Sequence, residues 1–311
     1  MSEFQFETPT AQDWQSVVQL FADEYGTEPE AELARLQNSL KPEDDARALV
    51  AKIDNVVLGF QSYMPWEVCQ AGTTTRCFQS GNSIVAPAAR GKGLFAQLLT
   101  ADAGLSPETP LFGFPVIASF QAFVRDGWTA PFRLESYVKP VLSRKSRDGT
   151  AQPPIPTSVN TRQVPDGYVG FLCQEPPMRR QLRLSGEAAQ TWQWQTDDQS
   201  MIFNYKLRKA QLKGLSLGTL VQLGGVSTLS DSRATLAEGV RSFLTMVGQQ
   251  YGSCLVEFAV NSLSDQWPRV LDDLGFRWRR KAGCNFVVRN LGPEPVPWNR
   301  WWVFRGDLDS W

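Results

Sequence analysis

Residues Asn82 to Leu99 read NSIVAPAARGKGLFAQLL. An apolar, strand-like run ends at Pro87, two cations and two glycines follow in Arg90–Gly93, and an apolar helix is expected to start at Leu94. Glycine lets the backbone approach a ligand closely, and the first N–H groups of a helix have no partner within that helix. The stretch therefore predicts a strand–loop–helix unit that holds an anion.

The composition is that of a globular chain with room for one large domain or two ordinary ones. It has 311 residues, 42% of them hydrophobic, and a formal net charge of −1. The chain lacks the excess of basic residues that is typical of nucleic-acid-binding proteins. Its longest apolar runs are far shorter than the ~20 residues that a membrane-spanning helix needs. The acidic start MSEFQFETPTAQDW lacks the apolar core of a signal peptide, so we expect a cytoplasmic protein without a membrane partner.

The chain contains no histidine. This excludes Ser-His-Asp and Cys-His catalysis and every histidine-ligated metal site. Its five cysteines are widely spaced and form no CxxC motif, so we expect reduced thiols and no metal. Cys69 and Cys77 flank an expected hairpin turn, where they could face each other across two strands.

The first 142 residues predict alternating helices and strands. Thr10 is expected to cap the first helix, with Asp13 three residues later as in a capping box. Further helices are expected at 30–40, 94–103 and 119–127, and strands at 46–53, 56–64, 76–85, 111–116 and 133–141.

A polar, proline-rich segment at 143–163 is interpreted as a linker. Beyond it a related order returns, with strands expected at 218–226, 254–260 and 284–291 and helices at 233–248 and 264–275. LFGFPV and CLVEFAV, like VRDGW and LDDLGF, occupy matching places in the two halves. The sequence therefore predicts an α/β fold with mixed sheets, built from two copies of one unit at 1–142 and 164–311.

The glycine loop can be compared with three known phosphate-binding motifs. A Walker A loop requires Ser or Thr after its lysine, and Lys92 is followed by Gly93. Gly91, Gly93 and Ala96 meet the dinucleotide pattern GxGxxA, but four residues separate the strand from the first glycine. No acidic residue stands about 20 positions further on, where the ribose ligand belongs.

The third motif fits best. VAPAARGKGLFAQLL resembles the acyl-CoA loop of the GNAT superfamily, the Gcn5-related N-acetyltransferases, whose pattern is Gln/Arg-x-x-Gly-x-Gly/Ala after a Val-x-Pro strand end. Matching positions are Val85, Pro87, Arg90, Gly93, Leu98 and Leu99. Phe95 stands where the family has Gly or Ala, which narrows the approach to the pyrophosphate.

The resemblance implies an acyl-CoA co-substrate, acetyl-CoA or another. The implied binding residues are Ile84, Val85, Arg90, Gly91, Lys92, Gly93, Leu94 and Phe95. The whole chain is similar to the tandem-repeat branch, in which sugar-nucleotide N-acyltransferases are found, through TWQWQ and the tail WWVFRGDLDSW. The second half lacks the loop, since STLSDSR stands in its place, so we expect one acyl-CoA per chain.

The implied reaction is attack by a neutral amine on the thioester, with the oxyanion held by backbone N–H groups near Val85. Many relatives have a glutamate that acts as the general base at the position where this chain has Asn82. They often have a tyrosine that protonates the leaving thiolate where this chain has Phe123. Asn82 and Ser83 are the positions implied to touch substrate, and Tyr137 is a further catalytic candidate. Remaining acid–base candidates are Glu67, Glu135 and Glu257.

Without a strong base, the acceptor should be an amine already largely neutral near pH 7–8. A lysine, with a pKa of about 10.4, is a poor candidate, and amines on sugar rings suit better. The expected function is N-acyl transfer to a small-molecule amine, such as the amino sugar of a nucleotide sugar. The alternatives are another small amine (an antibiotic or polyamine) and a non-catalytic acyl-CoA sensor. The sequence does not specify the oligomeric state.

Overall fold

The computed structural model describes residues 3–40, 45–70, 73–142, 163–172, 189–212, 215–292 and 296–308. The segment expected to be a linker lies outside these residues, apart from Gln163. Within the described residues, no helix combines the length and apolarity that a bilayer crossing requires.

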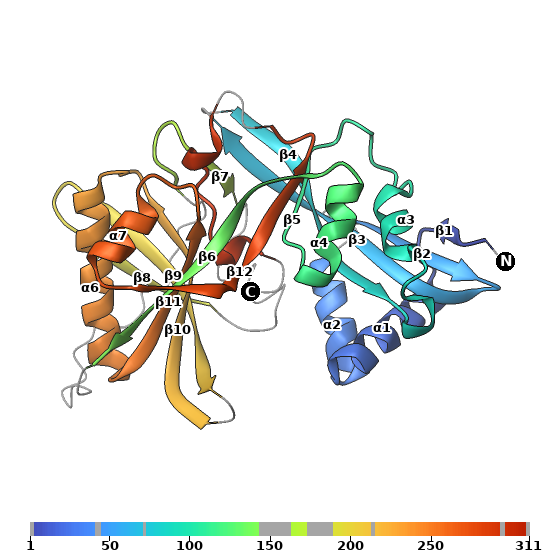
Figure 1. Cartoon of the computed structure of the whole chain (residues 1–311), viewed down its shortest axis with the longest axis horizontal. Helices are drawn as coiled ribbons and strands as arrows, with labels where there is room; N and C mark the ends of the chain where they lie inside the picture. The colour runs from blue at the N-terminus through green and yellow to red at the C-terminus, as the bar shows by residue number, and fades with distance from the viewer. Residues whose placement is uncertain are drawn as a thin grey trace.

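The chain folds into two α/β halves that lie side by side (Figure 1). The helices are α1 (Ala11–Tyr25), α2 (Pro29–Ser39), α3 (Leu94–Thr100), α4 (Ile117–Arg125), α6 (Arg233–Tyr251) and α7 (Trp267–Asp273). The strands are β1 (Gln5–Glu7), β2 (Arg47–Ile53), β3 (Val56–Gln70), β4 (Thr73–Val85), β5 (Leu111–Gly113), β6 (Thr129–Val141), β7 (Val169–Leu172), β8 (Gln190–Gln195), β9 (Ser200–Leu212), β10 (Leu215–Thr228), β11 (Cys254–Asn261) and β12 (Arg277–Arg289).

One continuous mixed sheet joins the halves. Its order is β1-β2-β3-β4-β5-β12-β6-β11-β10-β9-β8, with β7 added to β3. The pairs β4–β5 and β10–β11 are parallel. The mixed α/β fold expected from the sequence is confirmed.

The last strands of the two halves are exchanged. β12 of the second half lies between β5 and β6, and β6 of the first half pairs with β11 and β12. Neither half completes its sheet alone. We therefore do not expect either half to fold without the other. The division into units at 1–142 and 164–311 stays a prediction from the sequence.

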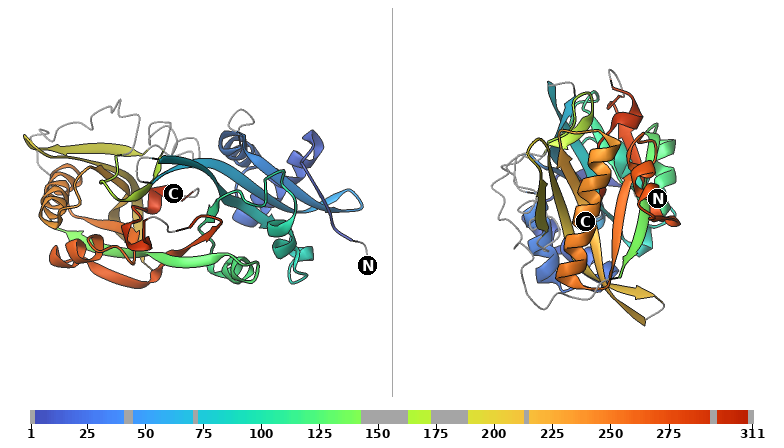
Figure 2. Two further views of the ribbon diagram at one scale, coloured as in Figure 1. Left: turned by 90° about the horizontal axis from the view of Figure 1, so that it is seen from above. Right: turned by 90° about the vertical axis from the view of Figure 1, so that its left-hand side faces the viewer.

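In the first half, helices cover both faces of the sheet. Val50 of β2 packs with α1 and α2, and its neighbours Leu49 and Ala51 pack with α3, because successive strand residues point to opposite faces. Figure 2 (left) shows α1 and α2, in blue, on one side of the strands, and α3 and α4, in green, on the other.

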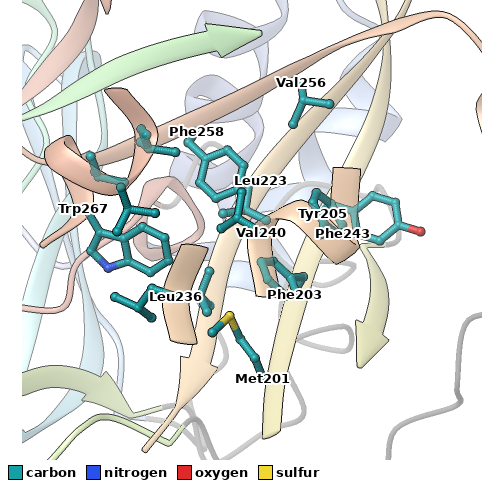
Figure 3. Packing of buried hydrophobic residues seen from close by; sticks show 14 of the residues in the cluster. Met201, Phe203, Tyr205, Leu223, Leu236, Val240, Phe243, Val256, Phe258 and Trp267 are labelled. Carbon is teal, nitrogen blue, oxygen red and sulfur yellow. The ribbon is translucent and has the colours of Figure 1, made fainter. Parts of the chain in front are cut away.

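In the second half, α6 and α7 cover one face of the sheet. Met201, Phe203 and Tyr205 of β9 and Phe243 of α6 lie in the cluster drawn in Figure 3. A separate aromatic cluster, which includes Trp66, Phe112, Phe286 and Trp301, joins strands of both halves.

The cysteines do not face each other across the hairpin. Cys69 lies opposite Thr74 and Cys77 lies opposite Trp66, so the two differ in register. Neither forms a disulfide with another described cysteine. Within the described part of the chain, no cluster of three potential metal-ligating residues occurs.

The start of α1 is held by a buried ion pair. The Thr10 backbone N–H and hydroxyl both donate to the Asp13 carboxylate (2.8 and 2.7 Å), and Lys52 Nζ lies 2.8 Å from it. Burial raises the pKa of Asp13, but the Lys52 and Thr10 hydrogen bonds outweigh it, so that pKa lies below its usual value. The same interaction has the opposite effect on Lys52, whose pKa is raised mainly by its hydrogen bond to Asp13. The capping box predicted from the sequence is confirmed.

We expect Asp13→Asn to lower the free energy of unfolding at pH 7 by about 3 kcal/mol, because Lys52 loses its buried partner. A carboxyl whose pKa is lower in the folded state stabilises the fold above its unfolded value of about 3.9. That contribution disappears as the pH falls through the folded value. Urea unfolding at pH 7 and pH 3 should therefore show the difference between wild type and variant shrinking in acid; an unchanged difference contradicts this account.

Candidate active site

The glycine loop follows β4 as the sequence predicts. Gly91 and Gly93 both have φ near +75°, in the left-handed region that favours glycine, and Gly93 caps α3. No heavy atom lies within 4 Å of where a Cβ would stand on either glycine. Their backbones therefore remain open to a ligand.

The arginine of the loop has two partners within the chain. Its Nε donates to the Val85 carbonyl (3.1 Å), and its Nη2 lies 2.5 Å from Glu24 at the end of α1. Lys92 is exposed, and Leu94 is buried against β3. In this conformation the Arg90 side chain ties the loop to β4 and α1.

A β-bulge interrupts β4 just before the loop. Phe60 pairs with Ile84 and Ser62 with Gly81, so Gln61 alone faces both Asn82 and Ser83. Asn82 has φ +47°, which is rare for a residue other than glycine. A bulge leaves backbone groups outside the ladder and redirects side chains, and it is common next to active sites.

The bulged residues are held by hydrogen bonds. Asn82 Oδ1 accepts from Arg35 Nη1 of α2 (2.6 Å), and its Nδ2 donates to Ser39 Oγ (3.3 Å). Ser83 Oγ donates to Oε1 of the buried Gln61 (2.6 Å). Helix α2 and the neighbouring strand therefore fix the backbone at the bulge.

β4 and β5 part beside the bulge. They pair over Phe78–Ser80 and Leu111–Gly113, after which β5 ends. A cavity of about 740 Å³ occupies this position. It is lined by Phe21, Tyr25, Thr27, Glu32 and Arg35 of the α1–α2 side, by Ser80–Val85 of β4, by Phe95, Ser119 and Phe123 of the α3–α4 side, by Phe114–Val116, and by Arg208 of β9.

The walls of the cavity include residues from helices on both faces of the sheet. The α3–α4 side, next to the glycine loop, is mainly apolar: Phe95 and Phe123 meet edge to face at 5.6 Å. The α1–α2 side carries charged side chains. The lining is therefore apolar on the side next to the glycine loop and carries charged side chains on the side of α1 and α2.

The structure brings together part of the expected site. Asn82, Ser83, Ile84, Val85 and Phe95 line the cavity. Tyr137 is not among the described lining residues; it lies in the core of the second half, where burial, then Glu135 and Asp272, raise its pKa to about 12.

Two of the carboxylate candidates also lie in the β6–β11 region. Burial raises the pKa of Glu135 on β6. Glu257 of β11 is buried and accepts hydrogen bonds from Ser136 Oγ (2.5 Å) and Gln222 Nε2 (2.8 Å). Glu257 is not among the described residues that line the cavity.

Helices α1 and α2 and strand β9 contribute lining residues that the sequence does not indicate. Glu32 and Arg35 form an ion pair (2.8 Å) with i,i+3 spacing, an ordinary feature of an exposed helix. Arg208 lies on a strand for which the sequence predicts no function. No local signal links these positions to the loop, because only the fold brings them together.

The second half has a corresponding parallel pair. β10 and β11 pair from Thr219–Cys254 to Gln222–Glu257 and then part. The C-terminal tail lies in that position: Phe304 pairs with Val260, and Trp302 Nε1 donates to the Val226 carbonyl (2.9 Å).

The tail approaches β10 so closely that a Cβ on Gly306 would lie 2.5 Å from the Gly224 carbonyl oxygen. The tail therefore fills the gap that remains open in the first half.

Comparison with known proteins gives a family match for part of the first half. Residues 5–109 match the family model described as an acetyltransferase (GNAT) domain. A search of curated proteins finds no match.

Solved structures resemble the whole chain in fold. A GCN5-related N-acetyltransferase from Anabaena variabilis has a TM-score of 0.63 at 13% identity, covering 93% of this chain and 73% of that one. One from Kribbella flavida has a TM-score of 0.54 at 12% identity, covering 93% and 71%. N-myristoyltransferase from Saccharomyces cerevisiae, with bound myristoyl-CoA, has a TM-score of 0.50 at 10% identity, covering 93% and 83%.

Proposed function

We propose that the chain is an acyl-CoA-dependent N-acyltransferase acting on a small-molecule amine, on the basis of the match of residues 5–109 to the acetyltransferase (GNAT) domain model. The observation that supports the proposal is the gap between β4 and β5, which lies beside the glycine loop and whose cavity is lined by residues from helices on both faces of the sheet. Acyl-CoA would enter from the loop side and the amine from the α1–α2 side.

The loop would hold the pyrophosphate through backbone N–H groups at Gly91 and Gly93, with Lys92 adding charge. Pantetheine would run along the apolar surface that the paired rings of Phe95 and Phe123 form beside the gap. The thioester carbonyl would then lie beside the bulge, where backbone N–H groups can stabilise the oxyanion.

The reaction is a direct acyl transfer. The amine nitrogen attacks the thioester carbonyl, the C–N bond forms, the C–S bond breaks, and the proton from the amine passes to the departing thiolate. Asn82 and Ser83 stand next to this position but are bound to Arg35 and Gln61, so they position the backbone and act as neither acid nor base. An acceptor amine already neutral near pH 7–8, as in the amino sugar of a nucleotide sugar, suits such a site.

The test is release of free thiol from acetyl-CoA with a panel of amines: amino sugars, nucleotide-linked amino sugars, polyamines and a lysine peptide. We expect amine-dependent thiol release that is at least about tenfold faster with the best amino sugar than with the lysine peptide. Binding of acetyl-CoA without thiol release for any amine would favour the sensor, and faster acylation of the lysine peptide would contradict the proposed acceptor class.

A further inference from the structure

A second cavity, of about 910 Å³, lies between α1 and α2, the two helices labelled below the strands of the first half in Figure 1. Its described lining residues all belong to these helices, and we call it the α1–α2 groove. None of them is among the described residues that line the cavity beside the glycine loop. The groove is therefore a site separate from the candidate active site.

The positions that line the α1–α2 groove recur at helical spacing. They are 11, 14, 15, 18 and 19 on α1, and 29, 30, 33, 36, 37 and 40 on α2. Each set forms one face of its helix. At 1.5 Å per residue, the lined stretch is about 12 Å long on α1 and about 16 Å long on α2. The groove is therefore elongated, with a length of about two to three helical turns.

The floor of the α1–α2 groove is an apolar strip that reaches the surface. Leu36 and Leu40 are buried, but Leu33, on the same face of α2, is 37% exposed. On α1, Val18 is buried and Trp14 is half-buried. An elongated apolar groove suits a further helix, whose apolar side chains at i, i+4 and i+7 would lie along it.

The surroundings of the groove are acidic. Residues 10–40 contain six acidic side chains and a single basic one. Three of the six form ion pairs within the chain: Asp13, Glu24 and Glu32. For the other three, Asp23, Glu28 and Glu30, no ion pair occurs among the described residues.

These three carboxylates lie at one end of the groove. Glu30 lines it, and Gln19, another lining residue, donates through its Nε2 to Asp23 Oδ1 (2.7 Å). Glu28 precedes Pro29, the first lining residue of α2. Only residues 26–28 separate the two helices, so this is the end where α1 finishes and α2 begins.

The charge distinguishes between possible occupants. The same face of a second copy would bring acidic groups together, and anionic lipid headgroups would also be repelled. A basic partner would instead be attracted, and its association would be accelerated.

We propose that the α1–α2 groove binds an amphipathic helix of another protein, with apolar side chains against Trp14 and Leu33 and with basic residues beside Asp23 and Glu30. The helix would be about three turns long, to match the groove. This interaction surface is independent of the proposed acyl transfer, because the two sites share no described lining residue.

The test uses three synthetic peptides of about 15 residues, long enough to form a helix. The first has leucine at i, i+4, i+7 and i+11 and lysine and alanine elsewhere. The second has glutamate in place of lysine, and the third has the composition of the first in scrambled order. Fluorescence anisotropy with the full chain should show the first peptide binding at least about tenfold more tightly than the other two. Equal affinities for all three, or no binding of the first, would overturn the proposal.

Leu33→Ser should weaken binding of the first peptide by about tenfold, because it removes an apolar contact at the surface. Leu263→Ser, at a leucine of the second half that is 46% exposed, is the matched control and should bind as the wild type does. Unchanged affinity in Leu33→Ser would contradict the proposed surface. Sedimentation that shows wild-type dimers, lost in Leu33→Ser, would identify a second copy as the occupant and overturn the proposal. The comparison of peptides on the wild type decides even if the variant fails to fold.

Discussion

Gly93→Asp should weaken acetyl-CoA binding by about a hundredfold or more while leaving the chain folded. The substitution places a carboxylate where the loop backbone would meet the pyrophosphate, and juxtaposed like charges cost several kcal/mol. Space is not the limitation, because no heavy atom lies within 4 Å of the point where a Cβ on Gly93 would stand. Equilibrium dialysis with labelled acetyl-CoA measures the loss.

A second glycine supplies the matched control. Gly104 has φ +72° and equally open surroundings, but it lies beyond α3, away from the loop. Gly104→Asp introduces the same charge and a similar backbone strain of about 1–2 kcal/mol. Unchanged acetyl-CoA affinity in Gly104→Asp and lost affinity in Gly93→Asp would place the pyrophosphate at the loop. If the two variants bind acetyl-CoA with equal affinity, the pyrophosphate does not bind at the glycine loop.

Trp302→Ala should lower the free energy of unfolding by about 4 kcal/mol, within the range for large aromatic side chains in cores. The Trp302 indole is buried, donates to the Val226 carbonyl and contacts Tyr168, Trp267 and Phe304 with ring centroids 5.3–5.8 Å away. Its removal leaves both a cavity and an unpaired carbonyl. Urea unfolding measures the change.

The control for this variant is another tryptophan. Trp278 of β12 is 47% exposed, so Trp278→Ala should cost under about 1 kcal/mol. A stable Trp302→Ala protein with a raised KM for the acceptor would mean that the tail tryptophans stack on substrate, contrary to the packing seen here.

The glycine loop can be predicted from the sequence because its signal is local. Strand, proline, cations, glycines and helix follow one another within eighteen residues, and the structure keeps that order. The capping box at Thr10 and Asp13 is similarly local. The strands β8 and β9 are not among the predicted elements, although QTWQWQ of β8 alternates in burial along part of its length.

The exchanged strands cannot be predicted from the sequence. β6 and β12 each read as a strand of their own half, and nothing in that pattern specifies the partner across the sheet. The same limitation applies to the candidate site. Arg208 lies far beyond Asn82 in the chain, and β5, β12, β6, β11 and β10 separate its strand from β4 in the sheet, yet both residues line the cavity.

The tail illustrates a different limitation. Its tryptophans are evident in the sequence, but both packing and stacking on a sugar agree with their composition. The gap between β10 and β11 decides in favour of packing, because the tail occupies the position that an acyl-CoA would need in a second site.

The most direct measurement is a calorimetric titration of the wild-type chain with acetyl-CoA. With the first gap open beside the glycine loop and the second filled by the tail, the account predicts saturation at one acetyl-CoA per chain. Saturation at two, or no binding by a folded protein, would contradict it.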